Sequence, residues 1–182
     1  MSHLPEYADQ RLELVEGIVI VMSPTGGQHG VVALEIGTWI RGYVKSNRLG
    51  YCTGAGTAYV LFKNPDGRDT GRAPDVGFVR ADRLPEGPPE GYIPFAPDLA
   101  VEVVSPGDSA SDIHDKVTDF LRCGTRLVWV LYPRSRTATV HTPEGARTVD
   151  AQGTLDGGDV LPGFSLALGE LFAVLDAPAA HR

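Results

Sequence analysis

Two carboxylates stand in short apolar segments where an acid is costly to bury. Asp75 follows Pro74 at the head of a valine-containing run, and Glu102 lies between Val101 and Val103. Short apolar runs bounded by turn residues are more typical of buried strands than of helices. A carboxylate inside such a strand raises the free energy unless it is paired, protonated or bound to a metal. Asp75 and Glu102 are therefore the first candidates for a functional site.

Two carboxylates that neighbouring strands hold close together form a ligand set for a hard divalent cation. Mg2+ takes one or two carboxylates and completes its shell with water and phosphate oxygens. Such an ion polarises a phosphodiester and lowers the pKa of an attacking water. We therefore expect Asp75 and Glu102 to bind Mg2+ or Mn2+. The alternatives are a capping role for Asp75 at the start of its strand and a strand-edge or loop-facing position for Glu102.

Lys116 is the candidate for a cation beside these acids. It is the only lysine after residue 63, and it lies on a predicted helix that follows the Glu102 strand. A lysine beside a metal site stabilises developing negative charge or assists the deprotonation of water. The alternative is a surface pair with Asp112, four residues earlier, which would stabilise the helix by about 0.3 kcal/mol.

The elements that must position these groups are indicated by hydrophobic periodicity. Apolar residues alternate on both sides of Glu16-Gly17, which predicts a β-hairpin over residues 11–23. With the two acids on adjacent central strands, the predicted elements form an α/β layered arrangement. We expect a single domain over residues 1–182, with loose termini at 1–10 and 176–182. The predicted helices are 28–47, 111–122 and 166–175, and the predicted strands are 50–62, 73–79, 96–105, 126–132, 137–142 and 146–149.

The first predicted helix has two different faces. Arg41, Lys45 and Arg48 recur at i, i+4 and i+7 on the polar face. This spacing fits either a solvated helix surface or a row of cations that follows a phosphate backbone. The opposite, apolar stripe, which we expect to be buried, consists of Val32, Ile36, Trp39, Ile40, Tyr43 and Val44.

The overall charge sets limits on the partners. The chain has a net charge of −7, which argues against a high-affinity, sequence-independent DNA binder, because such proteins are usually basic. A nuclease stays compatible with this charge, because carboxylates clustered around metals make the free protein more acidic. No apolar run approaches the ~20 residues of a membrane span, and the N-terminus lacks a signal-peptide pattern. We therefore expect a cytoplasmic protein without a membrane partner.

A series of short motifs gives the chain a family resemblance. Over roughly residues 7–175 it resembles the Uma-two family of restriction-endonuclease-like proteins, within the PD-(D/E)XK nuclease superfamily. Single motifs are not specific, but their order and spacing together are. The landmarks are Leu12-Glu-Leu-Val-Glu-Gly17, Met22-Ser-Pro24 with His29, Arg72-Ala-Pro-Asp75, Pro97-Asp-Leu-Ala-Val-Glu-Val-Val-Ser-Pro106, Asp112-x-x-x-Lys116, Gly124, Val128-Trp-Val130 and Leu161-Pro-Gly-Phe164.

The resemblance implies roles for the three central residues. Asp75 matches the metal-binding aspartate of the superfamily, and Glu102 matches the acid of its (D/E)-x-K element. The chain departs from this pattern because Val104 stands where the lysine is expected. Superfamily members can supply that lysine from the following helix, and Lys116 is placed for this substitution.

The same resemblance suggests further site residues. Glu13 matches an acid of the family's N-terminal motif and is our choice for a third acid near the metal, with Glu35 on the first helix as its rival. His29 would contact phosphate or orient a water, or alternatively cap or pack against the helix start. Arg72 joins Arg41, Lys45 and Arg48 as a possible path for the substrate backbone.

The fold implied is an α/β (α+β) restriction-endonuclease-like core. It consists of a mixed central sheet flanked by helices, with an N-terminal hairpin and additional C-terminal strands. The implied activity is metal-dependent hydrolysis of phosphodiester bonds in DNA by a homodimer that uses Mg2+ or Mn2+. The alternatives are a binding module that has lost catalysis and a hydrolase of a smaller phosphate ester.

Overall fold

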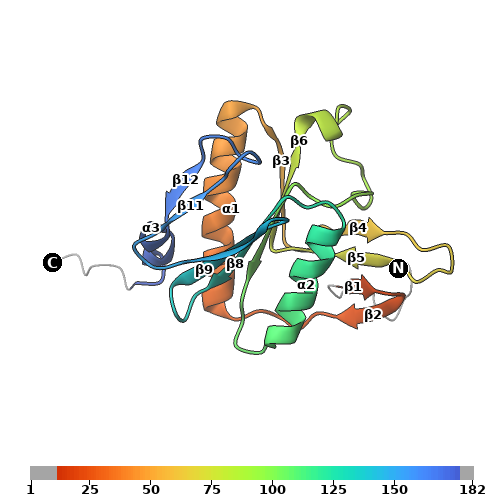
Figure 1. Ribbon diagram of the computed structural model, residues 1–182, viewed down its shortest axis with the longest axis horizontal. Helices are drawn as coiled ribbons and strands as arrows, with labels where there is room; N and C mark the ends of the chain where they lie inside the picture. The colour runs from red at the N-terminus through yellow and green to blue at the C-terminus, as the bar shows by residue number, and fades with distance from the viewer. Residues whose placement is uncertain (1–11, 177–182) are drawn as a thin grey trace.

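A computed structural model describes residues 12–176 of the chain (Figure 1). The loose termini expected at 1–10 and 176–182 lie outside these residues, except for Asp176. Asp176 forms an ion pair with Arg136.

The centre of the molecule is a six-stranded mixed sheet. Its strand order is β10-β9-β8-β7-β6-β3, and the two acids belong to the neighbouring strands β6 and β7 or to their ends. Strands β7 and β8 are parallel, whereas the other pairs in this sheet are antiparallel. The strands are β3 (Gly50–Gly54), β6 (Val76–Arg80), β7 (Leu99–Val103), β8 (Leu127–Tyr132), β9 (Thr137–Thr142) and β10 (Gly145–Val149).

Two helices cover opposite faces of this sheet (Figure 1). The first, α1 (Gly27–Asn47), packs on the face that carries Leu99, Val101 and Val103. The second, α2 (Ala110–Arg122), packs on the face that carries Ala100. Because side chains alternate along a strand, Glu102 in β7 faces α2. The predicted mixed sheet flanked by helices is therefore confirmed.

The parallel pair β7–β8 explains the position of α2. Parallel neighbours require a crossover connection, and here α2 supplies it. Ser109 caps α2 in a capping box: its hydroxyl accepts from the Asp112 backbone N–H, and the Asp112 carboxylate accepts from the Ser109 N–H. The capping box thus fixes the start of α2 relative to the end of β7. This determines the position of the following helical turn relative to Glu102.

A second, smaller sheet adds the N-terminal hairpin to the core. The predicted turn is confirmed: Glu16 and Gly17 have φ values of 48° and 82°, as a tight two-residue hairpin turn requires. The hairpin also pairs with β5, through Leu14 and Gly71. The strand order is β2-β1-β5-β4, with β1 (Leu12–Val15), β2 (Ile18–Val21), β4 (Tyr59–Phe62) and β5 (Thr70–Arg72).

The prediction of a single strand over residues 50–62 is wrong. It is divided into β3 and β4, which belong to different sheets. The break follows Gly54, where the Thr57 N–H donates to the Gly54 carbonyl and Gly56 has a φ of 93°. A turn with a left-handed residue interrupts a strand, and glycine adopts that conformation without strain.

Two further local predictions are wrong. Trp39 was expected in the buried stripe of α1, but it is 38% exposed, and its indole N–H donates to Glu35 Oε1 at 2.9 Å. The terminal helix predicted over 166–175 is a short strand, β12 (Ser165–Ala167), followed by α3 (Leu168–Ala173). The partner of β12 is β11 (Thr154–Asp156), which the sequence pattern did not indicate.

The additional C-terminal strands are confirmed, because β9 and β10 extend the sheet beyond β8 and β11 pairs with β12. A short 3-10 helix, η2 (Ala81–Arg83), follows β6. Within residues 12–176, no helix has both the length and the apolar character needed to cross a membrane.

Candidate active site

Asp75 is attached to the neighbouring strand that carries Glu102. Its backbone N–H donates to the Val101 carbonyl at 3.0 Å, and its Oδ2 accepts from the Val103 N–H at 2.9 Å. These two contacts lie on either side of Glu102 in β7, so they hold the aspartate beside that residue. Asp75 and Glu102 are both buried, at 6% and 4% exposure.

Lys116 reaches down from α2 into the same place. Its Nζ lies 3.3 Å from Glu102 Oε2 and 3.2 Å from Glu13 Oε1, and its side chain is 11% exposed. Burial disfavours the charged amine, but Glu102 and Glu13 outweigh burial and raise the pKa of Lys116. The ammonium form is therefore stabilised. Asp112, the surface partner in the alternative interpretation of Lys116, is part of the capping box of α2.

Glu13 is fixed by two cations and a backbone N–H. Its Oε2 accepts from Arg72 Nη1 at 2.9 Å, and its Oε1 accepts from the Ala73 N–H at 3.2 Å. Arg72 also donates through Nε and Nη2 to Asp119 Oδ2, at 2.9 and 2.6 Å. Arg72 is 5% exposed. The structure therefore places Arg72 in the acid cluster, which consists of Glu13, Arg72, Asp75, Glu102 and Lys116, and Arg72 also lines the cavity described below.

Asp119 was missed as a member of this network. It lies three residues after Lys116, one turn further along the same face of α2. That spacing was the available signal, but it identifies Asp119 only once Arg72 is known to lie opposite α2.

His29 is in the first turn of α1. Its Nε2 lies 3.0 Å from Asp75 Oδ2, and the residue is 7% exposed. The N-cap residue of α1 is Gly26, which has no side chain to cap the helix, and the polar contact of His29 is with Asp75. Its Nδ1 is buried and has no hydrogen-bond partner within the described part of the chain.

Among the acids of the site, Glu102 has the environment that most disfavours the ionised carboxylate. Burial raises the pKa of this carboxyl to about 8; Lys116 opposes the shift, whereas Asp75 and Glu13 add to it. Its Oε1 is buried without a hydrogen-bond partner among residues 12–176. A buried carboxylate oxygen in this condition is stabilised by a proton or by a cation.

The donor set fits a hard divalent ion. Residues 12–176 contain no group of three or more histidine, cysteine, aspartate or glutamate side chains arranged for a metal. Mg2+ does not require such a cage, since one or two carboxylates suffice when water and phosphate complete its shell. Asp75 and Glu102 offer the required oxygens, and the unpartnered Glu102 Oε1 is the observation that favours a cation there.

These groups line a cavity of about 510 Å3. Its wall includes the end of the hairpin and the following loop, the start of α1, the segment after β7 and the first turns of α2. The acids and Lys116 are thus gathered in one concave site that is open to a ligand, as expected for an active site.

The rival third acid lies elsewhere. Glu35 accepts the hydrogen bond of the exposed Trp39 and is not among the residues that line the cavity. Of the two candidates, the structure brings only Glu13 into contact with Lys116.

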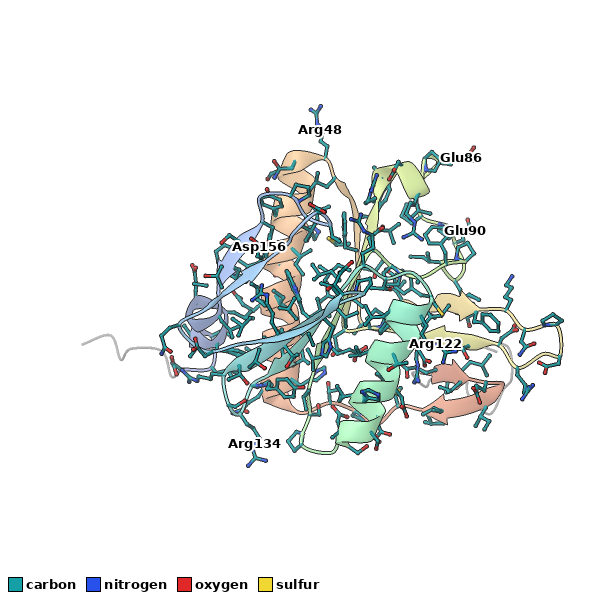
Figure 2. All side chains as sticks on the ribbon, viewed as in Figure 1. Arg48, Glu86, Glu90, Arg122, Arg134 and Asp156 are labelled. Atoms are coloured by element: carbon teal, nitrogen blue, oxygen red, sulfur yellow. The ribbon has the colours of Figure 1, made fainter. Side chains whose placement is uncertain are left out.

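The cation row of α1 lies beside the cavity but not in it. Arg41, Lys45 and Arg48 are all exposed. Arg41 lines a hollow of about 400 Å3 that shares His29 and Asp75 with the cavity. The three cations of the row together line a further hollow of about 430 Å3. Figure 2 shows Arg48 pointing away from the molecule at the end of α1.

Comparison with solved structures agrees with this fold. One is described as the "Crystal structure of a putative nuclease belonging to DUF820" from Anabaena variabilis; it has a TM-score of 0.79 and 22% sequence identity, over 90% of each chain. At this identity the likeness shows the fold alone, a mixed α/β core. A model of the Uma2 family, described as "Putative restriction endonuclease", matches residues 1–169. The chain belongs to the Uma2 family. A search of curated proteins finds no match.

Proposed function

We propose that this protein is a metal-dependent endonuclease that hydrolyses phosphodiester bonds in DNA. The observation that carries this proposal is the contact of the Lys116 amine with both Glu13 and Glu102 next to Asp75, at the bottom of an open cavity. Family membership and the nuclease-like neighbour support the same activity.

Asp75 and Glu102 would hold the metal, Mg2+ or Mn2+. When bound, the ion would polarise the scissile phosphodiester and lower the pKa of the attacking water. His29 Nε2 and the Val103 N–H both contact Asp75 Oδ2, so they fix the orientation of that carboxylate. Glu102 Oε2 is engaged by Lys116, which leaves Oε1 to bind a ligand.

Lys116 would supply the positive charge that, in the superfamily pattern, comes from a lysine at the position where this chain has Val104. Its Nζ is held between Glu13 and Glu102, so it is positioned before the substrate arrives. A preoriented ammonium stabilises the negative charge that develops on the phosphoryl oxygens. Arg72 holds Glu13 against Lys116.

The test is cleavage of plasmid DNA with Mg2+, Mn2+ or Ca2+, by the wild type and by Asp75→Asn. We expect cleavage with Mg2+ or Mn2+, and its loss in the variant. Mn2+ binding measured by calorimetry should be lost in the same variant. Cleavage that persists in the absence of metal, or that is unchanged in Asp75→Asn, would refute the proposal.

A second candidate is a binding module of the same fold that has lost catalysis. Val104 at the lysine position and the net charge of −7 favour it. In that case Asp75→Asn would leave DNA affinity intact, and the wild type would show no cleavage. A hydrolase of a smaller phosphate ester is the third candidate, and the cavity of about 510 Å3 would accept such a substrate. Only the binding of a polyanion should weaken steeply with salt.

We also propose that the active form is a homodimer, in which two sites could address the two strands of a duplex. Light scattering coupled to size-exclusion chromatography tests this. A monomer that makes double-strand breaks at protein concentrations where it stays monomeric would contradict it.

A further inference from the structure

A shallow groove between α1 and β3 leaves the catalytic cavity at His29 and Asp75. We call this hollow of about 400 Å3 the α1–β3 groove. Its α1 wall includes the small residues Gly30, Ala33 and Gly37, and its β3 wall includes Cys52, Thr53 and Gly54. Thr25, His29 and Asp75 line both the groove and the catalytic cavity, so the two hollows are continuous.

The end of the groove next to the cavity has an unused hydrogen-bonding group. His29 is 7% exposed, its Nε2 contacts Asp75, and its Nδ1 has no partner among residues 12–176. Buried polar atoms are nearly always hydrogen-bonded, so this nitrogen has room for a partner that a water or a ligand would supply. As an imidazolium the ring donates from Nδ1 to a phosphate oxygen, and as a neutral ring with Nε2–H it accepts from an amino or hydroxyl group.

The start of α1 adds to this end of the groove. Gly26 provides no side-chain cap, and the first turn of the helix contains no acid. The N-terminus of a long helix favours anions, because its first N–H groups lack partners and the helix dipole is positive there.

The far end of the groove leads to a row of cations. Arg41, Cys52 and Thr53 line both the α1–β3 groove and the next hollow, which Lys45 and Arg48 also line. At ~1.5 Å rise per residue, Lys45 lies about 6 Å beyond Arg41 along α1. Arg48 follows the last helical residue, Asn47, as the C-cap of the helix. This is a single row of positive charge, and Arg48 at its end points outward (Figure 2).

We propose that the α1–β3 groove binds the part of a single nucleic-acid strand that adjoins the scissile phosphate. His29 Nδ1 and the start of α1 contact the strand where it leaves the cavity, and Arg41, Lys45 and Arg48 follow its backbone. Single-strand sites combine a positively charged groove with surfaces for the bases, and Tyr51 lines the hollow beside the cation row. One row of cations beside one groove suits one strand better than a duplex. This inference rests on the proposed nuclease function and names its substrate as a frayed or single-stranded nucleic acid.

Two glycines of α1 provide a matched test. A Cβ added at Gly30 or at Gly42 would meet nothing within 4 Å, and both glycines are exposed, so we expect the fold to accept leucine at either position. Both glycines are exposed on the same helix, but only Gly30 lines the groove. Gly30→Leu should fill the groove, and Gly42→Leu should leave it open. Melting temperatures of both variants check that the fold is kept.

The probe is a fluorescein-labelled oligothymidylate of about ten nucleotides, within the site sizes of known single-strand binders. Its affinity is measured by fluorescence anisotropy in EDTA, so that no cleavage occurs. Because contacts to one base contribute ~1–3 kcal/mol, we expect Gly30→Leu to weaken binding about tenfold or more and Gly42→Leu to have no effect. A duplex of the same length should bind more weakly than the single strand.

A charge variant gives a second readout, which does not depend on filling the groove with a leucine side chain. Arg41→Gln should reduce the slope of log affinity against log salt by about 0.7, as expected for one phosphate contact of a single strand. Equal affinities of Gly30→Leu and Gly42→Leu with an unchanged slope in Arg41→Gln would overturn the proposal. So would tighter binding of the duplex or no binding of the oligonucleotide by the wild type.

The outcomes separate this inference from the proposed function. Plasmid cleavage that depends on Asp75, together with equal binding by the two glycine variants, refutes the groove and supports the nuclease. A contrast between the glycine variants in a protein that cleaves nothing refutes the nuclease and supports the groove.

Discussion

The molecule has two charged regions whose side chains are held in opposite ways. In the acid cluster, defined by Glu13, Asp75, Glu102, Lys116 and Arg72, every member is at least nine-tenths buried except Lys116, whose side chain is 11% exposed. In the cation row of Arg41, Lys45 and Arg48, all three side chains are exposed.

This difference separates two kinds of electrostatic function. Buried charges are stable only when they are paired, so the acid cluster is ordered by its own ion pairs before any ligand binds. Exposed charges are screened by salt and act on a partner only at short range or through their sum. We therefore expect the cluster to determine the reaction rate and the row to determine affinity.

Asp75→Asn should have the largest effect on DNA cleavage, because it removes the charge of a proposed metal ligand from the acid cluster. We expect DNA cleavage to fall about a thousandfold, since a bound ion contributes several kcal/mol to the transition state. Cleavage rates with Mn2+ measure this. Asp82→Asn, in the exposed pair with Arg80, is the control and should cleave like the wild type. A residual rate near that of the wild type would place the chemistry elsewhere.

Lys116→Met should damage stability and activity together. It leaves Glu13 and Glu102 buried without their shared cation, and breaking a buried pair from one side costs about 3 kcal/mol. Urea denaturation measures the loss. Lys45→Met, in the exposed row, should change stability by less than about 0.5 kcal/mol. If the two variants were equally stable, the cluster would not be ordered by its ion pairs.

Glu13→Gln and Glu35→Gln distinguish the two candidate third acids. Glu13 positions Lys116, so its variant should lose about ten- to hundredfold in cleavage, as do changes in groups that orient metal-site residues. Glu35 bonds the exposed Trp39, so its variant should be near wild type. Single-turnover rates with saturating DNA provide the measurement. A larger loss in Glu35→Gln would reverse the assignment.

The stability of the metal-free protein should fall as pH rises from about 5 to 8. The folded pKa of Glu102 is raised from 4.5 to about 8, mainly by burial. Between these values the folded state retains a proton that the unfolded state has lost, so unfolding becomes easier with increasing pH. Urea denaturation at each pH measures the free energy of unfolding, and Glu102→Gln should make it depend less on pH. Mg2+ should restore stability most near pH 8. An equal pH dependence in the wild type and in Glu102→Gln would contradict the raised pKa of Glu102.

Lys45→Gln should have the smallest effect, confined to affinity. Removing one exposed phosphate contact should lower single-strand affinity a few-fold, and the slope against log salt should fall by about 0.7. The cleavage rate at saturating substrate should be unchanged. Lys63→Gln, another exposed lysine outside the row, is the matched control for the anisotropy measurement. A changed saturated rate in Lys45→Gln would mean that the row takes part in the reaction.

Local sequence signals predicted the elements that depend on neighbouring residues. The turn at Glu16-Gly17 and the extent of α1 follow from the conformations that those residues adopt readily. The two acid strands were also predicted, because apolar runs bounded by proline and turn residues are local signals.

Local sequence signals could not predict the contacts between distant elements. Arg72 meets Glu13 across 59 positions and Asp119 across 47, so its burial depends on how β5 lies against β1 and α2. The 50–62 segment looked like one strand, because nothing local showed that its halves would join different sheets. Trp39 fits a helical stripe by spacing, yet no core packs over it.

The sequence by itself determined the types of group available: two acids in buried strands, one lysine on the next helix and a row of cations on the first. Only the tertiary structure decided which groups meet. It turned Lys116 toward Glu13 and Glu102, enclosed Arg72 and left Arg41 beside an open groove. The physical reason is that a side chain's partners depend on strand order and on the helix crossing between β7 and β8, which bring distant segments together.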